Sequence, residues 1–101
     1  MRALVTGATG FIGSNLCRAL GRAGWKVVIL RRAGSNLRAL EGVEFVEHLG
    51  DVTEAASIRP AMRGVDAVFH LAASLSFWSG DAEAQRRTNV DGTRNVVAAA
   101  L

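Results

Sequence analysis

A glycine-rich stretch near the start of the chain constrains the fold more than any other feature. It reads Thr6-Gly7-Ala8-Thr9-Gly10-Phe11-Ile12-Gly13 and follows the apolar run Ala3-Leu4-Val5. The run suits a strand buried on both faces, and the apolar residues from Ile12 to Ala23 recur at helical spacing. The stretch therefore predicts a strand, a glycine turn and a helix in succession.

Each glycine has its own task in such a turn. Gly7 allows the sharp change of direction, Gly10 leaves room for a phosphate beside the backbone, and Gly13 lets the helix pack closely on the strand. N–H groups at the helix start then point at a pyrophosphate, which favours dinucleotide binding over a plain turn. The cofactor-binding residues predicted here are Gly7, Thr9, Gly10, Phe11, Ile12 and Gly13.

Composition excludes several classes of protein. The 101 residues suffice for one small domain, and a hydrophobic content of 50% suits a covered sheet. The net charge of +3 comes from scattered arginines, with Lys26 as the only lysine, so no basic run predicts nucleic-acid binding. No stretch reaches the roughly 18 apolar residues that span a membrane, and we expect a cytoplasmic protein.

Cysteine and histidine do not predict a metal site. Cys17 is the single cysteine, so we expect a buried helix residue rather than a disulfide or a cysteine cluster. His70 has no second ligand at metal-binding spacing, since His48 lies far away in sequence. We therefore expect a structural role for His70.

A second strand, Lys26 to Leu30, ends at Arg31-Arg32. In dinucleotide folds a carboxylate near this point binds the adenosine ribose, whereas an arginine accommodates a 2′-phosphate. No carboxylate stands nearby, so NADP is more strongly favoured than NAD. The alternative is two solvated arginines on a loop.

The remaining elements alternate between strand and helix patterns. The pattern predicts a helix with Ala56 and Met62 inward and Arg59 outward, although Pro60 opposes a regular helix there. The alternation predicts an α/β fold, a doubly wound parallel sheet of strand order 3-2-1-4 with helices on both faces. The elements expected after the second strand are a turn at 33–36, a short helix at 37–40, strands at 43–49 and 67–73, and helices at 53–62 and from 81 to the end.

Small and aromatic residues follow the fourth strand. Leu71-Ala72-Ala73 would let the ribose and nicotinamide side of a cofactor approach the sheet edge. Phe77 and Trp78 in the next loop either line a substrate pocket or pack beneath the loop.

Five motifs together resemble the extended short-chain dehydrogenase/reductase superfamily, also called the NAD-dependent epimerase/dehydratase family. Within it, Gly24-Trp25-Lys26-Val27 leading to Leu30-Arg31-Arg32, together with Trp78, looks most like the dihydroflavonol-reductase-like branch and the hopanoid-associated sugar epimerases. The five motifs, in the family's order, are the glycine loop, the arginine pair, Gly50-Asp51, His70-Leu71-Ala72-Ala73 and Asn89-Val90-Asp91-Gly92-Thr93.

The resemblance implies further site residues. In that family the carboxylate at Asp51 takes the adenine amino group, the backbone at Val52 meets the ring, and the asparagine at Asn89 stabilises the active-site geometry. Other readings of these residues are open. Asp51 or Thr53 could cap the following helix, and Asn89 could lie on an ordinary polar helix face.

The resemblance also implies that catalysis lies elsewhere. The family uses a tyrosine, a lysine four residues later and a serine or threonine, but this chain has no tyrosine and Lys26 belongs to the second strand. We therefore predict no catalytic residue within 1–101, which would be the N-terminal part of an NAD(P)-binding Rossmann domain. The expected whole is an NAD(P)-dependent oxidoreductase, epimerase or dehydratase acting on a sugar-nucleotide or carbinol/ketone substrate.

An alternative is a non-catalytic NAD(P)-binding sensor, built as a natural half-domain. A small-molecule substrate is expected only for a full-length enzyme. Without further strands the fourth strand would be an apolar edge, which favours self-association.

Overall fold

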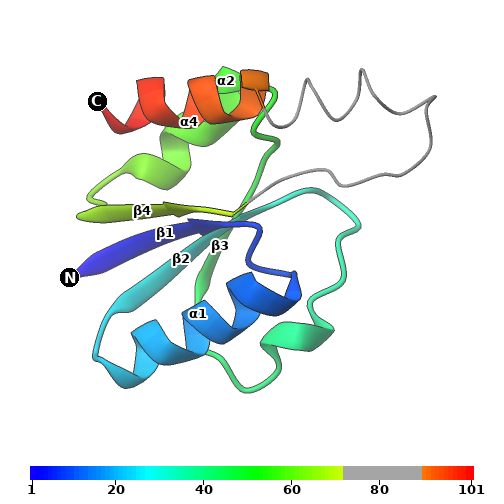
Figure 1. Ribbon diagram of the computed structural model, residues 1–101, viewed down its shortest axis with the longest axis vertical. Helices are drawn as coiled ribbons and strands as arrows, with labels where there is room; N and C mark the ends of the chain where they lie inside the picture. Colours follow the sequence, from blue (N-terminus) through cyan, green and yellow to red (C-terminus); the bar gives the residue numbers. More distant parts are fainter. Residues whose placement is uncertain (72–89) are drawn as a thin grey trace.

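The computed structural model describes residues 1–71 and 90–101, and in that part of the chain a parallel sheet lies between two layers of helices (Figure 1). The strands are hydrogen-bonded in the order β3-β2-β1-β4. All the pairings are parallel, with Leu4 opposite both Val28 and Val68. This is the doubly wound order that the alternating pattern predicts. The elements are β1 (Arg2–Thr6), α1 (Phe11–Arg22), β2 (Lys26–Arg31), η1 (Arg38–Leu40), β3 (Val46–Leu49), α2 (Ala55–Ile58), η2 (Arg59–Met62), β4 (Ala67–His70) and α4 (Gly92–Ala100).

Successive residues of the two central strands face opposite sides of the sheet, and each side has its own core. Ala3 and Val5 of β1 pack with Cys17 and Leu20 of α1. Leu4, between them, packs on the other side with the residues of the second core. Because both faces are covered, the central strands are continuous apolar runs rather than alternating ones. That second core comprises Leu4, Val28, Leu30, Val52, Ile58, Ala61 and Val96.

Helix α1 contains Gly21 and ends before Gly24. Gly24 has a φ of 87°, a left-handed conformation that suits glycine. The N–H of Trp25 donates to the Leu20 carbonyl and that of Gly24 to the Gly21 carbonyl, which is a Schellman ending. Gly21 therefore lies inside the helix, and Gly24 ends it. Cys17 is fully buried, as expected.

Several element boundaries differ from the sequence-based expectation, most clearly at the third strand and the helix that follows it. The third strand begins at Val46 rather than at residue 43, since the preceding segment runs from η1 without pairing to β2. The expected helix at 53–62 is a four-residue α2 followed by the 3₁₀ helix η2, with Pro60 in the first turn of η2. Proline cannot donate the hydrogen bond that a continuing α-helix requires, which explains the division.

The same region corrects one inward-facing residue. Ala56 is exposed, while Ile58 and Ala61 are buried in its place; Met62 is partly buried and Arg59 is exposed, as expected. The change to a 3₁₀ helix shifts the buried face, because its residues repeat every three positions instead of every 3.6. The fourth strand ends at His70, before the expected residue 73, and Ala72 and Ala73 lie outside the described residues.

Helix α1 meets the turn after β1 at Gly13. A Cβ at Gly13 would overlap the Gly7 carbonyl oxygen and would lie 2.7 Å from the Gly7 carbonyl carbon and 2.9 Å from the Ala8 Cα. The close approach predicted at this glycine is confirmed, and the contacted surface is the turn itself. Both neighbours are backbone, so no side chain can move aside to make room.

We therefore expect Gly13→Ala to lower the free energy of unfolding by about 1–3 kcal/mol, the usual cost of overpacking. Gly21→Ala is the matched control in the same helix, where an added Cβ meets nothing within 4 Å. That variant should gain up to about 1 kcal/mol from helix propensity. Urea unfolding of both variants checks the contrast, and equal stability changes would contradict the close contact.

Candidate dinucleotide-binding site

The glycine turn places unbonded N–H groups at the start of α1. Gly7 has a φ of 71°, and its carbonyl oxygen accepts a hydrogen bond of 3.2 Å from the Gly10 N–H. The first helical bond runs from the Ser14 N–H to the Gly10 carbonyl at 2.9 Å. Between them, the N–H groups of Phe11, Ile12 and Gly13 meet no acceptor in the described part of the chain. These three donors can bind an anion.

The electrostatics of this helix end also favour an anion. The first turn of α1 carries no acidic residue, and Gly10 supplies no side-chain cap. The positive end of the helix dipole is therefore uncompensated by the helix itself. Among the described residues, a Cβ at Gly10 would have only the Gly7 carbonyl oxygen nearby, at 3.5 Å, so these residues leave the space beside Gly10 open. Phe11 and Ile12 direct exposed side chains away from the core, with 83% and 70% of their surfaces accessible.

The end of β2 carries the two arginines that the sequence singled out. The Nε of Arg31 donates to the Glu47 carboxylate at 2.6 Å, and its Nη1 lies 3.5 Å from both the Arg32 carbonyl and the Ser35 hydroxyl. The hydrogen bond from Arg31 lowers the pKa of Glu47. Arg32 is exposed, and its guanidinium makes no bond within the described residues. The two arginines therefore differ in their surroundings.

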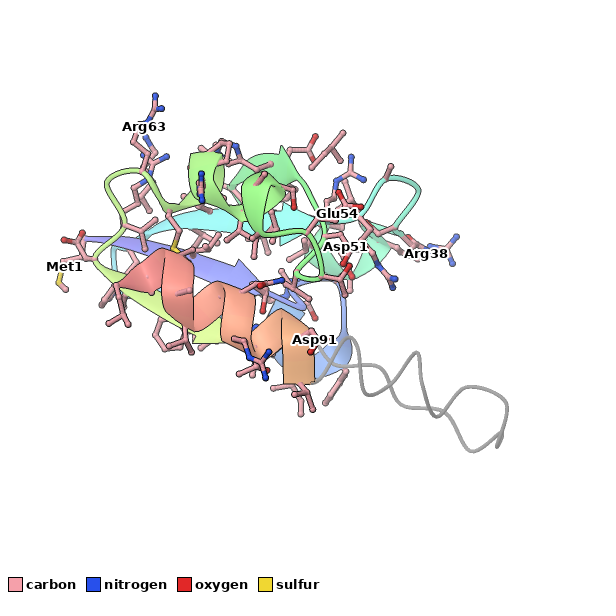
Figure 2. All side chains as sticks on the ribbon, turned by 90° about the horizontal axis from the view of Figure 1, so that it is seen from above. Met1, Arg38, Asp51, Glu54, Arg63 and Asp91 are labelled. Carbon is pink, nitrogen blue, oxygen red and sulfur yellow. The ribbon has the colours of Figure 1, made fainter. Side chains whose placement is uncertain are left out.

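The loop after β3 brings Asp51 to the carboxyl ends of the strands, where β2 also ends (Figure 2). Its Oδ1 accepts from the N–H and the hydroxyl of Thr53, at 2.9 and 2.8 Å. Helix α2 begins later, after Glu54, and has no side-chain cap. The alternative that Asp51 or Thr53 caps this helix is therefore wrong, because the carboxylate closes a turn within the loop instead.

Helix α4 holds the neighbouring residue, Val52, in place. The Asn95 side-chain amide donates to the Val52 carbonyl at 2.9 Å. A Cβ at Gly92 would lie 2.6 Å from a methyl carbon of Val52, so only glycine permits this approach. Val52 is 6% exposed and forms part of the core. The start of α4 thus lies directly against the loop that carries Asp51.

His70 joins the ends of two strands to α4. Its Nδ1 lies 2.6 Å from the Thr6 hydroxyl oxygen, which also accepts from the Leu71 N–H at 3.0 Å. Its Nε2 lies 3.0 Å from the Thr93 hydroxyl oxygen. Partial burial lowers the pKa of His70, because desolvation disfavours the charged ring. This geometry agrees with the structural role expected for His70.

The predicted site residues fall into two groups. The glycine loop, both arginines, Asp51, Val52 and Leu71 all lie at the carboxyl ends of the strands or directly after them, where doubly wound sheets bind ligands. Ala72, Ala73 and Asn89, with Phe77 and Trp78, lie outside the described residues. Sequence reasoning assigned no supporting contacts to a further set of residues, since their partners lie 16 to 64 positions away. They are Thr6, Glu47, Gly92, Thr93 and Asn95.

Two further observations concern residues 1–71 and 90–101. No group of three histidine, cysteine or acidic side chains there could hold a metal ion. None of the helices in the same residues has the length and apolar character needed to cross a membrane.

Comparisons with known proteins agree with this geometry. The model of the NAD dependent epimerase/dehydratase family matches residues 3–101. Sterol demethylase protein B of Methylococcus capsulatus is 44% identical over 94 residues, which cover 93% of this chain and 29% of that protein. The 2-alkyl-3-oxoalkanoate reductase of Stenotrophomonas maltophilia is 38% identical over 99 residues, covering 98% of this chain and 29% of that protein.

A solved structure extends the comparison to a bound cofactor. The Bordetella bronchiseptica enzyme WbmG, in complex with NAD and UDP, superposes with a TM-score of 0.84 at 32% identity. The match covers 99% of this chain and 33% of that one. The chain thus spans about a third or less of the length of the proteins it matches.

The lowered pKa of His70 gives a test of its position. In the unfolded chain His70 binds a proton near its ordinary pKa of 6.5, whereas in the folded chain it binds the proton only at lower pH. The stability that neutral His70 contributes is therefore present above pH 6.5 and is lost as the pH falls through the folded-state pKa. Urea unfolding on both sides of this pH should show a larger loss for the wild type than for His70→Gln. Parallel losses in the two proteins would contradict the assignment.

Proposed function

The chain belongs to the NAD-dependent epimerase/dehydratase family, and on that premise we propose that residues 1–101 form the N-terminal part of an NAD(P)-binding domain. The observation that carries the proposal is the set of unbonded N–H groups at Phe11, Ile12 and Gly13, behind the turn at Gly7. A pyrophosphate would accept from these donors at the positive end of α1. Thr9, within the same turn, completes the phosphate-binding loop.

The adenosine half of the cofactor would lie over the ends of β2 and β3. Asp51 keeps one carboxylate oxygen that has no partner in the described residues, and this oxygen can accept from the adenine amino group. The backbone at Val52 would meet the ring. Arg31 and Arg32 stand where the ribose would lie, and no carboxylate replaces them in sequence. The proposal therefore favours NADP over NAD, although WbmG was solved with NAD.

The nicotinamide half would lie past β4, along Leu71, Ala72 and Ala73, with Asn89 supporting the geometry at the start of the last helix. A bound nicotinamide supplies hydride exchange with a carbon of the substrate. This chain contributes binding and orientation, because it has no tyrosine and its one lysine, Lys26, begins β2. Proton transfer would fall to residues of the full-length protein.

The whole protein would act as an oxidoreductase, epimerase or dehydratase. Its substrate class would be a sugar nucleotide or a carbinol/ketone compound, because WbmG was solved in complex with UDP and one relative is a 2-alkyl-3-oxoalkanoate reductase. Among the described strands β4 pairs with β1 alone, so its other edge can accept a further strand or a second copy of the chain.

Substitution of Gly10 tests the proposed phosphate site. An alanine Cβ fits at this position, 3.5 Å from the nearest atom, so the variant should fold. The same methyl group would occupy the space that a phosphate needs. We expect Gly10→Ala to bind NADPH at least about tenfold more weakly, because the anion is kept from its donors.

The measurement is a titration of NADPH fluorescence with the longest protein that the gene encodes. Gly21→Ala serves as the matched control, because it adds the same methyl group to open space on α1. The control should bind as the wild type does. Unchanged binding by folded Gly10→Ala would refute the proposed site.

A further inference from the structure

Glu47 lies beside the proposed 2′-phosphate site without belonging to the family motifs described above. β2 and β3 pair with Ile29 opposite Glu47 and Arg31 opposite Leu49. Because side chains alternate along a strand, Arg31 and Glu47 lie on the same face of the sheet, one step apart on the diagonal. Their ion pair at 2.6 Å therefore follows from the strand register.

The ion pair and two longer contacts involve the Nε and Nη1 atoms of Arg31. Its Nε is bound to Glu47, and its Nη1 lies over the turn at residues 32–35, toward the Arg32 carbonyl and the Ser35 hydroxyl. The Ser35 N–H closes that turn on the Arg32 carbonyl at 3.1 Å. The Arg31 side chain is 17% exposed and that of Glu47 is 42% exposed. Arg31 thus braces the turn that carries Arg32, and Glu47 balances its charge.

The surroundings of Arg32 differ from those of Arg31. It is exposed at the start of the braced turn, and its guanidinium has no partner in the part of the chain that the structure describes. A guanidinium that is not already bonded can offer two parallel donors to a phosphate, which gives the strongest form of this contact. Arg31 can offer only the donors that Glu47 and the turn leave.

We propose that Glu47 sets the cofactor preference by neutralising and holding Arg31, so that Arg32 alone presents a free guanidinium to the adenosine 2′-phosphate. This inference rests on the proposed dinucleotide function. In it Glu47 is a positioning residue that also limits the attraction for the phosphate, since a carboxylate near the site repels the added negative charge. The preference for NADP is then smaller than two arginines in sequence would suggest.

Glu47→Gln tests the charge of Glu47 separately from its hydrogen bond to Arg31. Glutamine keeps an oxygen that can accept from the Arg31 Nε, while the negative charge is lost. We expect the ratio of the Kd for NADH to the Kd for NADPH to rise about threefold to tenfold, by removal of a partly screened repulsion. Arg32→Gln should lower the same ratio by about tenfold or more, because the charge-assisted bonds to the phosphate are lost.

The experiment is a fluorescence titration of both reduced dinucleotides with the longest protein that the gene encodes. Glu44→Gln is the matched control, because Glu44 is exposed, lies before β3, and changes the net charge equally. Its ratio should stay at the wild-type value. Thermal unfolding of each variant confirms that the fold is kept.

Two results would overturn the inference. One is a ratio that is unchanged or lowered in Glu47→Gln, and the other is a ratio that Arg32→Gln leaves unchanged. Failure of the proposed function looks different, because the wild type and Glu44→Gln would then bind neither dinucleotide. A wild type that prefers NADH would remove the NADP assignment, whereas a raised ratio in Glu47→Gln would still support the role of Glu47.

Discussion

The close contact between α1 and the turn after β1 is the constraint on which the rest of the site depends. Because Gly13 has no side chain, the first turn of the helix lies directly on the Gly7 carbonyl and the Ala8 backbone. This contact sets both the direction of the helix and the place where its first N–H groups emerge. A helix held farther away would keep its dipole but would no longer direct these donors at the strand ends.

A second glycine has the corresponding task on the other face of the sheet. Gly92 lets α4 approach the Val52 side chain closely, although Gly13 lets α1 approach the backbone of the turn more closely still. Hydrogen bonds then fix the helix, from Asn95 to the Val52 carbonyl and between Thr93 and His70. Both helix layers therefore reach the sheet at the edge where its strands end, on either side of the proposed cofactor. In Figure 2, Asp51 and Asp91 lie toward this end and Met1 and Arg63 lie toward the other.

The fold could be predicted from the sequence because its signals are local. Buried apolar runs, a glycine turn and alternating elements predict a doubly wound sheet, and the observed order β3-β2-β1-β4 confirms it. The α2 region is harder to predict. Pro60 indicates that a regular helix cannot continue through it, but it does not indicate where the helix divides. The start of β3 depends on pairing with β2, which a pattern along one segment cannot reveal.

The supporting contacts of the site could not be predicted in the same way. Thr6 and His70 are 64 positions apart, and only the pairing of β1 with β4 brings them together. Glu47 is one acidic residue among several in its region, and its effect on Arg31 depends on the strand register. Motifs thus predict which groups would touch a cofactor, whereas the residues that hold those groups can be identified only in the three-dimensional structure.

The most direct test of the central claim is an NMR titration of the backbone amides with NADP. If the pyrophosphate binds at the start of α1, the largest shifts should appear at Gly10, Phe11, Ile12 and Gly13. The amides of Gly24 and Gly42, in turns away from the glycine loop, should hardly move. Shifts confined to those two turns, with the glycine loop unchanged, would contradict the account.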